Sequence, residues 1–224
     1  MAFAIRTYSK NKKLVSLRRE QIARRAARVF VKKGYRRVNL RQIASACGMS
    51  IGNLYHYVGT KEDIVYLVFD YVMSEVVEFI EAISPTYDAL PPTEALRRAI
   101  DTYYRKVDDL QDSVVFMYQE TKELQPNARK SVFELERRLS YVFERILDRG
   151  YASGEFKISG SPIIAQNIVI LGHMWALKRW LLGKHYVLEE YIKEQTNFIL
   201  EGICKDKGLG RGAEPGDKVL ASSA

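Results

Sequence analysis

The segment Ser50–Tyr57 (SIGNLYHY) places several side chains that can bind nucleic acids within the length of one short helix. The amide of Asn53 can hydrogen-bond to a base edge in the major groove of DNA, most favourably to adenine. The hydroxyl of Tyr55 and the imidazole of His56 suit phosphate oxygens. A glycine inside a helix costs about 1 kcal/mol relative to alanine, so Gly52 suggests close approach by another surface. These residues predict a helix that reads double-stranded DNA.

The distribution of charge supports this interpretation. Residues 1–61 contain 15 Lys and Arg residues and one acidic residue, Glu20, whereas residues 62–224 contain 20 basic and 26 acidic residues. A basic region of this density is typical of a surface that binds a polyanion. We therefore expect the DNA contacts to lie in the N-terminal part of the chain.

The elements that must position these side chains are predicted to be helices. Apolar residues recur at helical spacing along most of the chain, and alternating strand-like runs are scarce, so we expect an all-α fold. Asn39 and Ser50 can cap two short helices, and Gly48 suits the turn between them, which predicts a helix-turn-helix. The predicted helices of this part span residues 17–33, 40–46 and 51–57.

A long helix is expected to follow. Thr60, with Asp63 three residues later, can cap a helix that ends near Ile83, before Ser84-Pro85. Further helices are predicted over residues 93–109, 112–124, 127–150, 161–183 and 187–205. The chain is thereby divided into a basic flexible arm (1–16), a helix-turn-helix DNA-binding head (17–59), an all-helical ligand-binding and dimerising body (60–206) and a flexible tail (207–224).

The sequence LRQIASACGMSIGNLYHYVGTKEDI, within Arg19–Ile64, resembles the DNA-binding head of the TetR family of transcriptional regulators. In that family three helices form the head, and a fourth links it to a helical body. Asn39 and Tyr57 depart mildly from the family pattern, which usually has Thr and Phe there. The resemblance implies DNA contacts by Arg41, Ser50, Gly52, Asn53, Tyr55, His56 and Lys61.

Several basic and aromatic residues of this region could instead serve packing or solubility. Tyr55 could belong to the core, although a Tyr-His-Tyr run cannot bury all three members on one helical face. No cluster of metal-ligating or catalytic residue types surrounds His56 in the sequence, so we expect neither a metal site nor general-base catalysis there. Arg24, Arg25 and Arg28 fit a solvated helix face. The arm would either enter a minor groove or act as a solubilising tail, through Arg6, Lys10, Lys12 and Lys13.

The body carries large side chains at helical spacing that could line a cavity for a small apolar effector. Each of them, taken singly, fits core packing better. Polar residues in apolar helices point more directly to a ligand, and His173 could orient a carbonyl or a carboxylate. The candidate ligand-binding residues are Phe69, Met73, Tyr104, Met117, Tyr118, Glu120, Asn167 and His173.

The resemblance also implies that the last two predicted helices pack against their copies in a second subunit as a four-helix bundle. A two-fold dimer uses the same patch twice. It sets two reading helices one or more DNA turns apart, at ~34–36 Å per turn, which predicts a palindromic operator. The candidate interface residues are Trp175, Trp180, Tyr191 and Phe198.

Two segments, FMYQETKEL and GHMWALKRW, are similar to segments of family members that regulate fatty-acid and acyl-CoA metabolism. The resemblance therefore implies a ligand-responsive repressor, released from DNA by an apolar effector such as a fatty acid or an acyl-CoA. The effector would move the helix that begins at Thr60 as a lever. A constitutive or architectural DNA-binding protein without an effector is the alternative.

The remaining residue types argue against other classes of function. Cys47 and Cys204 lie far apart and form no metal-type cluster. The sequence has no nucleophile motif and no Gly-rich phosphate loop, so we expect neither an enzyme nor a cofactor nor a metal. No stretch suits a transmembrane helix, and the N-terminus lacks the apolar region of a signal peptide. We expect a cytoplasmic homodimer whose partners are DNA and a small effector.

Overall fold

The computed structural model describes Ile5 and residues 11–204 of the chain. Within these ranges the regular elements are helices, which confirms the predicted all-α class. They are α1 (Lys12–Lys33), α2 (Leu40–Ala46), α3 (Ile51–Tyr55), α4 (Lys61–Asp88), α5 (Pro92–Asp109), α6 (Gln111–Glu120), α7 (Pro126–Ala152), α8 (Ser161–Leu177), α9 (Arg179–Leu182) and α10 (Leu188–Ile203). Two short 3-10 helices span Tyr35–Arg37 and Thr121–Glu123.

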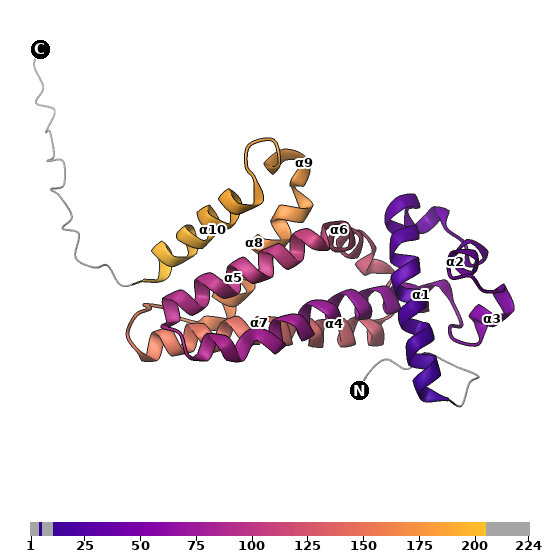
Figure 1. The fold of residues 1–224 in the computed structure, drawn as a ribbon, viewed down its shortest axis with the longest axis horizontal. Coiled ribbons are helices and arrows are strands. Elements are labelled where there is room, and N and C mark those ends of the chain that lie inside the picture. The colour runs from indigo at the N-terminus through magenta and orange to yellow at the C-terminus, as the bar shows by residue number, and fades with distance from the viewer. Residues whose placement is uncertain (1–4, 6–10, 205–224) are drawn as a thin grey trace, which may run out of the picture.

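Figure 1 shows an elongated molecule with α1, α2 and α3 gathered at one end. Helix α4 begins beside the head and runs into the body, where it packs against α5 and α7. Helices α9 and α10 lie along one outer side of the body (Figure 1). No helix of the described ranges is long and apolar enough to cross a lipid bilayer.

The predicted starts of the two short helices are confirmed by their hydrogen bonds. The side chain of Asn39 accepts a bond from Gln42 N, and the Gln42 side chain accepts one from Asn39 N, at 3.0 and 2.9 Å. Ser50 Oγ accepts from Asn53 N at 3.1 Å, and helix α3 starts there. Gly48 adopts a φ of +68°, which favours glycine, and so allows the sharp turn between α2 and α3.

The predicted start of the first helix at residue 17 is wrong. Helix α1 begins at Lys12, because the side chain of Asn11 caps it by accepting a bond from Leu14 N at 3.0 Å. Lys12 and Lys13 are therefore helical and not part of a flexible arm. Arg6 and Lys10 of the predicted arm, like the whole predicted tail, lie outside the described residues.

The predicted end of the long helix before Ser84-Pro85 is also wrong, because α4 continues through Pro85 to Asp88. Contacts made by the last turn outweigh the single backbone hydrogen bond that a proline removes. Tyr87 is buried and donates a hydrogen bond to Thr102 Oγ1, and Asp88 pairs with Arg145 at 2.8 Å.

Other predicted helices end early or are interrupted. α3 ends at Tyr55 and α6 at Glu120, and the helix predicted over 161–183 is interrupted between α8 and α9. Apolar residues keep their helical spacing across these points, so the sequence pattern does not indicate the breaks. The boundaries matter for function because the turn after α6 lies next to the head.

The head does not have a separate core. A single cluster of buried side chains includes residues of α1 to α3, the first half of α4, and parts of α6 and α7. At its centre, the ring of Phe116 on α6 stacks on that of Phe30 on α1, with centroids 5.3 Å apart and planes 7° apart. Phe69 on α4 contacts Phe116 edge-on at 6.2 Å. We call Phe30, Phe69 and Phe116 the joint, since they connect the head to the body.

We expect Gly150→Ala to lower the free energy of unfolding by about 1–3 kcal/mol through overpacking. A Cβ atom at Gly150 would lie 2.0 Å from Cδ2 of Phe156, which is buried against this glycine. Chemical denaturation measures the loss. Gly202→Ala is the matched control: no atom lies within 4 Å of the added Cβ, and alanine gains up to about 1 kcal/mol in a helix. Equal stability of the two variants would contradict this packing.

Candidate DNA-binding and effector sites

Helix α3 turns its apolar side inward and its polar side outward. Leu54 is completely buried in the head, whereas Gly52, Asn53, Tyr55 and His56 are exposed. The nearest atom to a Cβ built at Gly52 is Ser50 Oγ at 4.0 Å, so no other part of the described chain packs on this glycine. The predicted reading face is therefore accessible to a large partner.

The two basic residues predicted to contact DNA differ in their surroundings. Arg41, in the first turn of α2, is exposed. Lys61, at the start of α4, is partly buried, and its Nζ donates to Tyr35 O at 2.5 Å and lies 3.9 Å above the Tyr35 ring. Burial lowers the pKa of Lys61, an effect that nearby carboxylates, including Glu120, oppose. If Lys61 contacts a DNA phosphate, its ammonium group must bind the phosphate and the carbonyl oxygen of Tyr35 at the same time.

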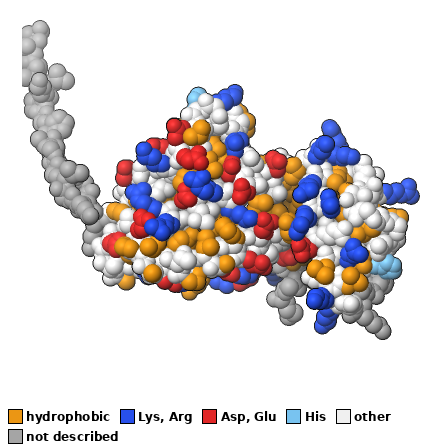
Figure 2. Space-filling model, in the orientation of Figure 1, with side chains coloured by type: hydrophobic (Ala, Val, Ile, Leu, Met, Phe, Trp, Pro, Cys, Tyr) orange, Lys and Arg blue, Asp and Glu red, His pale blue; other side chains and the backbone are white. Residues whose placement is uncertain are grey.

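Figure 2 shows Lys and Arg side chains over the head, while Asp and Glu side chains are more frequent over the body. The basic N-terminal part of the sequence therefore forms one end of the molecule, and the more acidic remainder forms the rest. A positive head next to a mixed, more acidic body orients the head toward a polyanion. Among the described residues no group of His, Cys, Asp and Glu side chains is placed to hold a metal ion.

We predict that Asn53→Ala weakens binding to the preferred DNA sequence by about 1–3 kcal/mol and relaxes selectivity at one base position. Arg41→Ala is expected to weaken binding to all sequences alike and to flatten the dependence on salt. Arg41 is a cleaner phosphate variant than Lys61, because Lys61 also binds Tyr35. Titrations with preferred and random duplexes at several salt concentrations measure both effects; identical behaviour of the two variants would contradict the assigned roles.

A small apolar cavity of about 40 Å³ lies inside the body where five helices meet. Four predicted ligand-binding residues line it, namely Met73, Met117, Tyr118 and His173. The other lining residues are Val72, Val76, Tyr103, Val107, Val114 and Leu139. Its volume is far below the roughly 300–1,000 Å³ of typical small-molecule pockets. A larger ligand must therefore displace side chains.

The polar groups of this cavity form one chain of hydrogen bonds. His173 Nε2 lies 2.8 Å from Tyr103 Oη, and His173 Nδ1 lies 3.0 Å from Tyr118 Oη. Burial lowers the pKa of His173 to about 4, so the imidazole is neutral near pH 7. Gly172 permits this approach, since a Cβ atom there would lie 2.9 Å from Tyr103 Cε1.

Two of the predicted ligand-binding residues belong to the aromatic packing of the core. Phe69 does not line the cavity, because it packs in the joint. Tyr104 is fully buried and donates a hydrogen bond to Ile168 O at 3.0 Å. Its neighbour Tyr103 takes the place beside His173. The sequence contains the pair Tyr103-Tyr104 but no signal for which of the two lines the cavity beside His173.

Two further candidates face away from the cavity. Glu120 is at the end of α6, where its charge opposes the lowering of the Lys61 pKa by burial and adds to the raising of the Tyr35 pKa by burial. Asn167 is exposed on the outer face of α8. The helical rotation between Asn167 and His173 places them on different sides of α8, so they cannot bind one ligand together.

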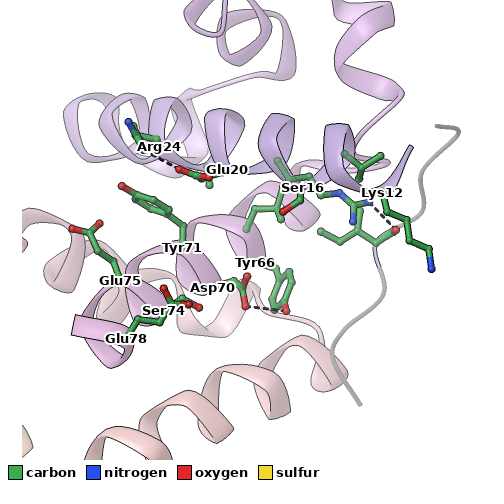
Figure 3. A pocket seen from close by; sticks show the side chains of 15 residues that line it. Lys12, Ser16, Glu20, Arg24, Tyr66, Asp70, Tyr71, Ser74, Glu75 and Glu78 are labelled. Carbon is green, nitrogen blue, oxygen red and sulfur yellow. Dashed lines mark hydrogen bonds and ion pairs between the residues drawn. The ribbon is translucent and has the colours of Figure 1, made fainter. Parts of the chain in front are cut away.

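A larger cleft of about 920 Å³ is lined mainly by side chains of α1 and α4 (Figure 3). Glu20 and Arg24 of α1 lie on one wall, and Asp70, Glu75 and Glu78 of α4 lie on the other. Charged walls of this kind do not suit an apolar molecule, whose binding would remove their hydration. The cavity beside His173 is therefore the better candidate for an apolar effector.

The predicted dimer residues fall into two groups. Trp175 and Tyr191 are only 1% and 2% exposed within one chain, where Trp175 Nε1 donates to Asp108 and Tyr191 Oη donates to Leu171 O. They fill the core between α5, α8 and α10, which argues against a direct role for them in an interface. Trp180 and Phe198 are 66% and 68% exposed and remain candidates.

Family models match both parts of the chain. A model described as "Bacterial regulatory proteins, tetR family" matches residues 22–66, and one described as "Tetracyclin repressor-like, C-terminal domain" matches residues 89–201. The HTH-type transcriptional regulator HbdR of Aromatoleum sp. (strain CIB) is 30% identical over 211 residues, which cover 92% of this chain and 90% of HbdR.

Solved structures share the fold. A bacterial regulatory protein in the tetR family from Rhodococcus RHA1 has a TM-score of 0.74 at 24% identity, over 84% of this chain and 98% of that one. FadR from Bacillus subtilis, in complex with stearoyl-CoA, has a TM-score of 0.68 at 21% identity, over 81% and 97%. The matched families and HbdR are regulators and not enzymes. The chain therefore belongs to the TetR family of bacterial transcriptional regulators.

Proposed function

We propose that this protein is a ligand-responsive repressor that binds a palindromic operator as a homodimer and releases it when a small apolar effector enters the body cavity. The observation that carries this proposal is the accessible face of α3, with Gly52 and Asn53 exposed on a basic head. Regulators of this family bind operator DNA and small effectors, typically as homodimers. For this chain the contact residues are Arg41, Ser50, Gly52, Asn53, Tyr55 and His56, with Lys61 shared with Tyr35.

An apolar stripe supports the proposed dimer. Ile163 and Ile170 are exposed on α8, and Phe198 is exposed on α10. Asn167 lies between the two isoleucines on the same face. Exposed apolar side chains at helical spacing on two neighbouring helices favour burial against an identical pair, as in a two-fold four-helix bundle. Asn167 is then a polar residue of the interface and not a ligand-binding residue.

The proposed effector response rests on the geometry of α6. Its residues Val114, Met117 and Tyr118 line the cavity, while Phe116 on another side stacks on Phe30 of the head. A cavity of about 40 Å³ cannot hold an acyl chain unless its walls move, and the flexible Met117 allows such movement. A ligand that binds only the opened cavity shifts the population toward it. The head then moves with α6 as well as with α4.

Effector titration against operator binding tests this function. A DNA-binding assay is repeated with increasing concentrations of stearoyl-CoA, the ligand present in the FadR structure, and of shorter acyl-CoA molecules. We expect at least one of them to weaken operator binding by about 5–150-fold, the usual range of allosteric coupling. A protein that binds these molecules without any change in DNA affinity would instead be a constitutive DNA-binding protein.

A further inference from the structure

The hydrogen bonds around His173 have a direction that follows from their hydrogen atoms. A neutral imidazole donates from one ring nitrogen and accepts at the other. Tyr103 is fully buried, and His173 Nε2 is the one hydrogen-bond partner of its hydroxyl within the described residues. A buried hydroxyl hydrogen without an acceptor is unfavourable. Tyr103 therefore donates to Nε2, and Nδ1 carries the ring hydrogen.

With this direction of donation, one hydroxyl hydrogen at the edge of the cavity is not donated within the chain of hydrogen bonds. His173 Nδ1 donates to Tyr118 Oη, 3.0 Å away, so the hydroxyl hydrogen of Tyr118 takes no part in the chain of bonds. Tyr118 is 46% exposed and also lines the cavity. Its hydrogen is thus available to an acceptor atom of a bound molecule.

The cavity offers no positive charge for an anion. Neither Lys nor Arg is among its lining residues in the described part of the chain. Burial raises the pKa values of Tyr103 and Tyr118, and the negative charge of Glu136 on α7 raises both further. An ionised carboxylate placed here would lose its hydration, gain no cation and meet the field of Glu136.

We propose that the cavity selects effectors whose polar group is a neutral carbonyl, such as a thioester, an ester or a ketone, and that Tyr118 donates a hydrogen bond to that carbonyl oxygen. Free carboxylic acids with the same chain are discriminated against. This assignment rests on the effector response proposed above and names the chemical class of the effector. The apolar chain of the ligand occupies the space opened beside Met73 and Met117.

Matched probes test the assignment on the full-length protein. For a short, a medium and a long saturated chain, the ethyl thioester and the free acid are titrated by calorimetry near neutral pH. The best-bound thioester is expected to bind at least about tenfold more tightly than its acid. Tyr118→Phe is expected to weaken thioester binding by about three- to tenfold, as the loss of one hydrogen bond should, and to leave acid binding unchanged.

A second pair of variants tests the electrostatic part. Glu136→Gln keeps an oxygen that can accept the bond from Gln166 Nε2 but removes the charge, so it is expected to strengthen acid binding at least about twofold without changing thioester binding. Glu134→Gln on the same helix is the control. Its side chain is exposed and pairs with Arg137, and neither probe should respond to its replacement.

Several results would overturn the assignment. Equal affinity for acid and thioester, or undiminished thioester binding by Tyr118→Phe, excludes Tyr118 as a selective donor. In that case the effector response still stands if either probe releases operator DNA. If no probe of any length binds, both the assignment and the proposed apolar effector are wrong.

Discussion

Replacing Ile170 and Phe198 together by aspartate is expected to yield a monomer that binds a palindromic operator at least about a hundredfold more weakly than the parent protein. Both side chains are exposed in one chain, Ile170 on α8 and Phe198 on α10. In the proposed dimer they face their copies across the two-fold axis, where four aspartates would be desolvated near one another. A monomer carries one head, so it loses the gain in affinity from two linked half-sites.

Analytical ultracentrifugation and operator titration measure this prediction together. The matched control replaces Phe133 and Tyr141 of α7 by aspartate, since these side chains are also exposed but lie outside the proposed interface. The control is expected to remain a dimer with unchanged DNA affinity. A dimeric double variant of Ile170 and Phe198 would show that another surface makes the contact.

Phe116→Ala is expected to lower the free energy of unfolding by about 3–5 kcal/mol, because it leaves a cavity in the joint. It is also expected to reduce the effect of the effector on DNA affinity at least about fivefold. The ring of Phe116 is buried and stacks on Phe30 of the head while neighbouring residues of α6 line the cavity. Without the ring, movement of α6 no longer reaches α1 through a packed contact.

Thermal or chemical unfolding gives the first quantity, and operator titration with and without effector gives the second, at a temperature where the variant is folded. Phe133→Ala, at an exposed position, should change stability by less than about 0.5 kcal/mol and leave the response intact. A Phe116→Ala protein that is destabilised but responds fully to the effector would mean that α4 alone transmits the signal.

Local sequence signals predicted the head well because its geometry is set by short-range chemistry. Asn39, Ser50 and Thr60 cap their own helices through side-chain bonds to residues three positions later. Gly48 supplies a backbone conformation that other residues avoid. The exposed positions of Tyr55 and His56 follow from the rotation of a short helix around the buried Leu54.

The body was less predictable because distant contacts decide which face of each helix is buried. Trp175 and Tyr191 are large and amphipathic, which fits an interface as well as a core, and their hydrogen bonds to α5 and α8 could not be read from spacing. The spacing also does not show which of Tyr103 and Tyr104 lines the cavity, because the two neighbours differ by one step of helical rotation. Pro85 is tolerated because Tyr87 packs in the body.

Selection of duplexes from a random DNA pool by the full-length protein tests the central claim most directly, namely that two copies of α3 read successive grooves of one operator. The account predicts enrichment of an inverted repeat whose half-site centres lie one or more helical turns apart, on the order of 34–36 Å per turn. It also predicts that Asn53→Ala loses selectivity at symmetric positions in both half-sites. Enrichment of no motif, or of one without two-fold symmetry, would contradict it.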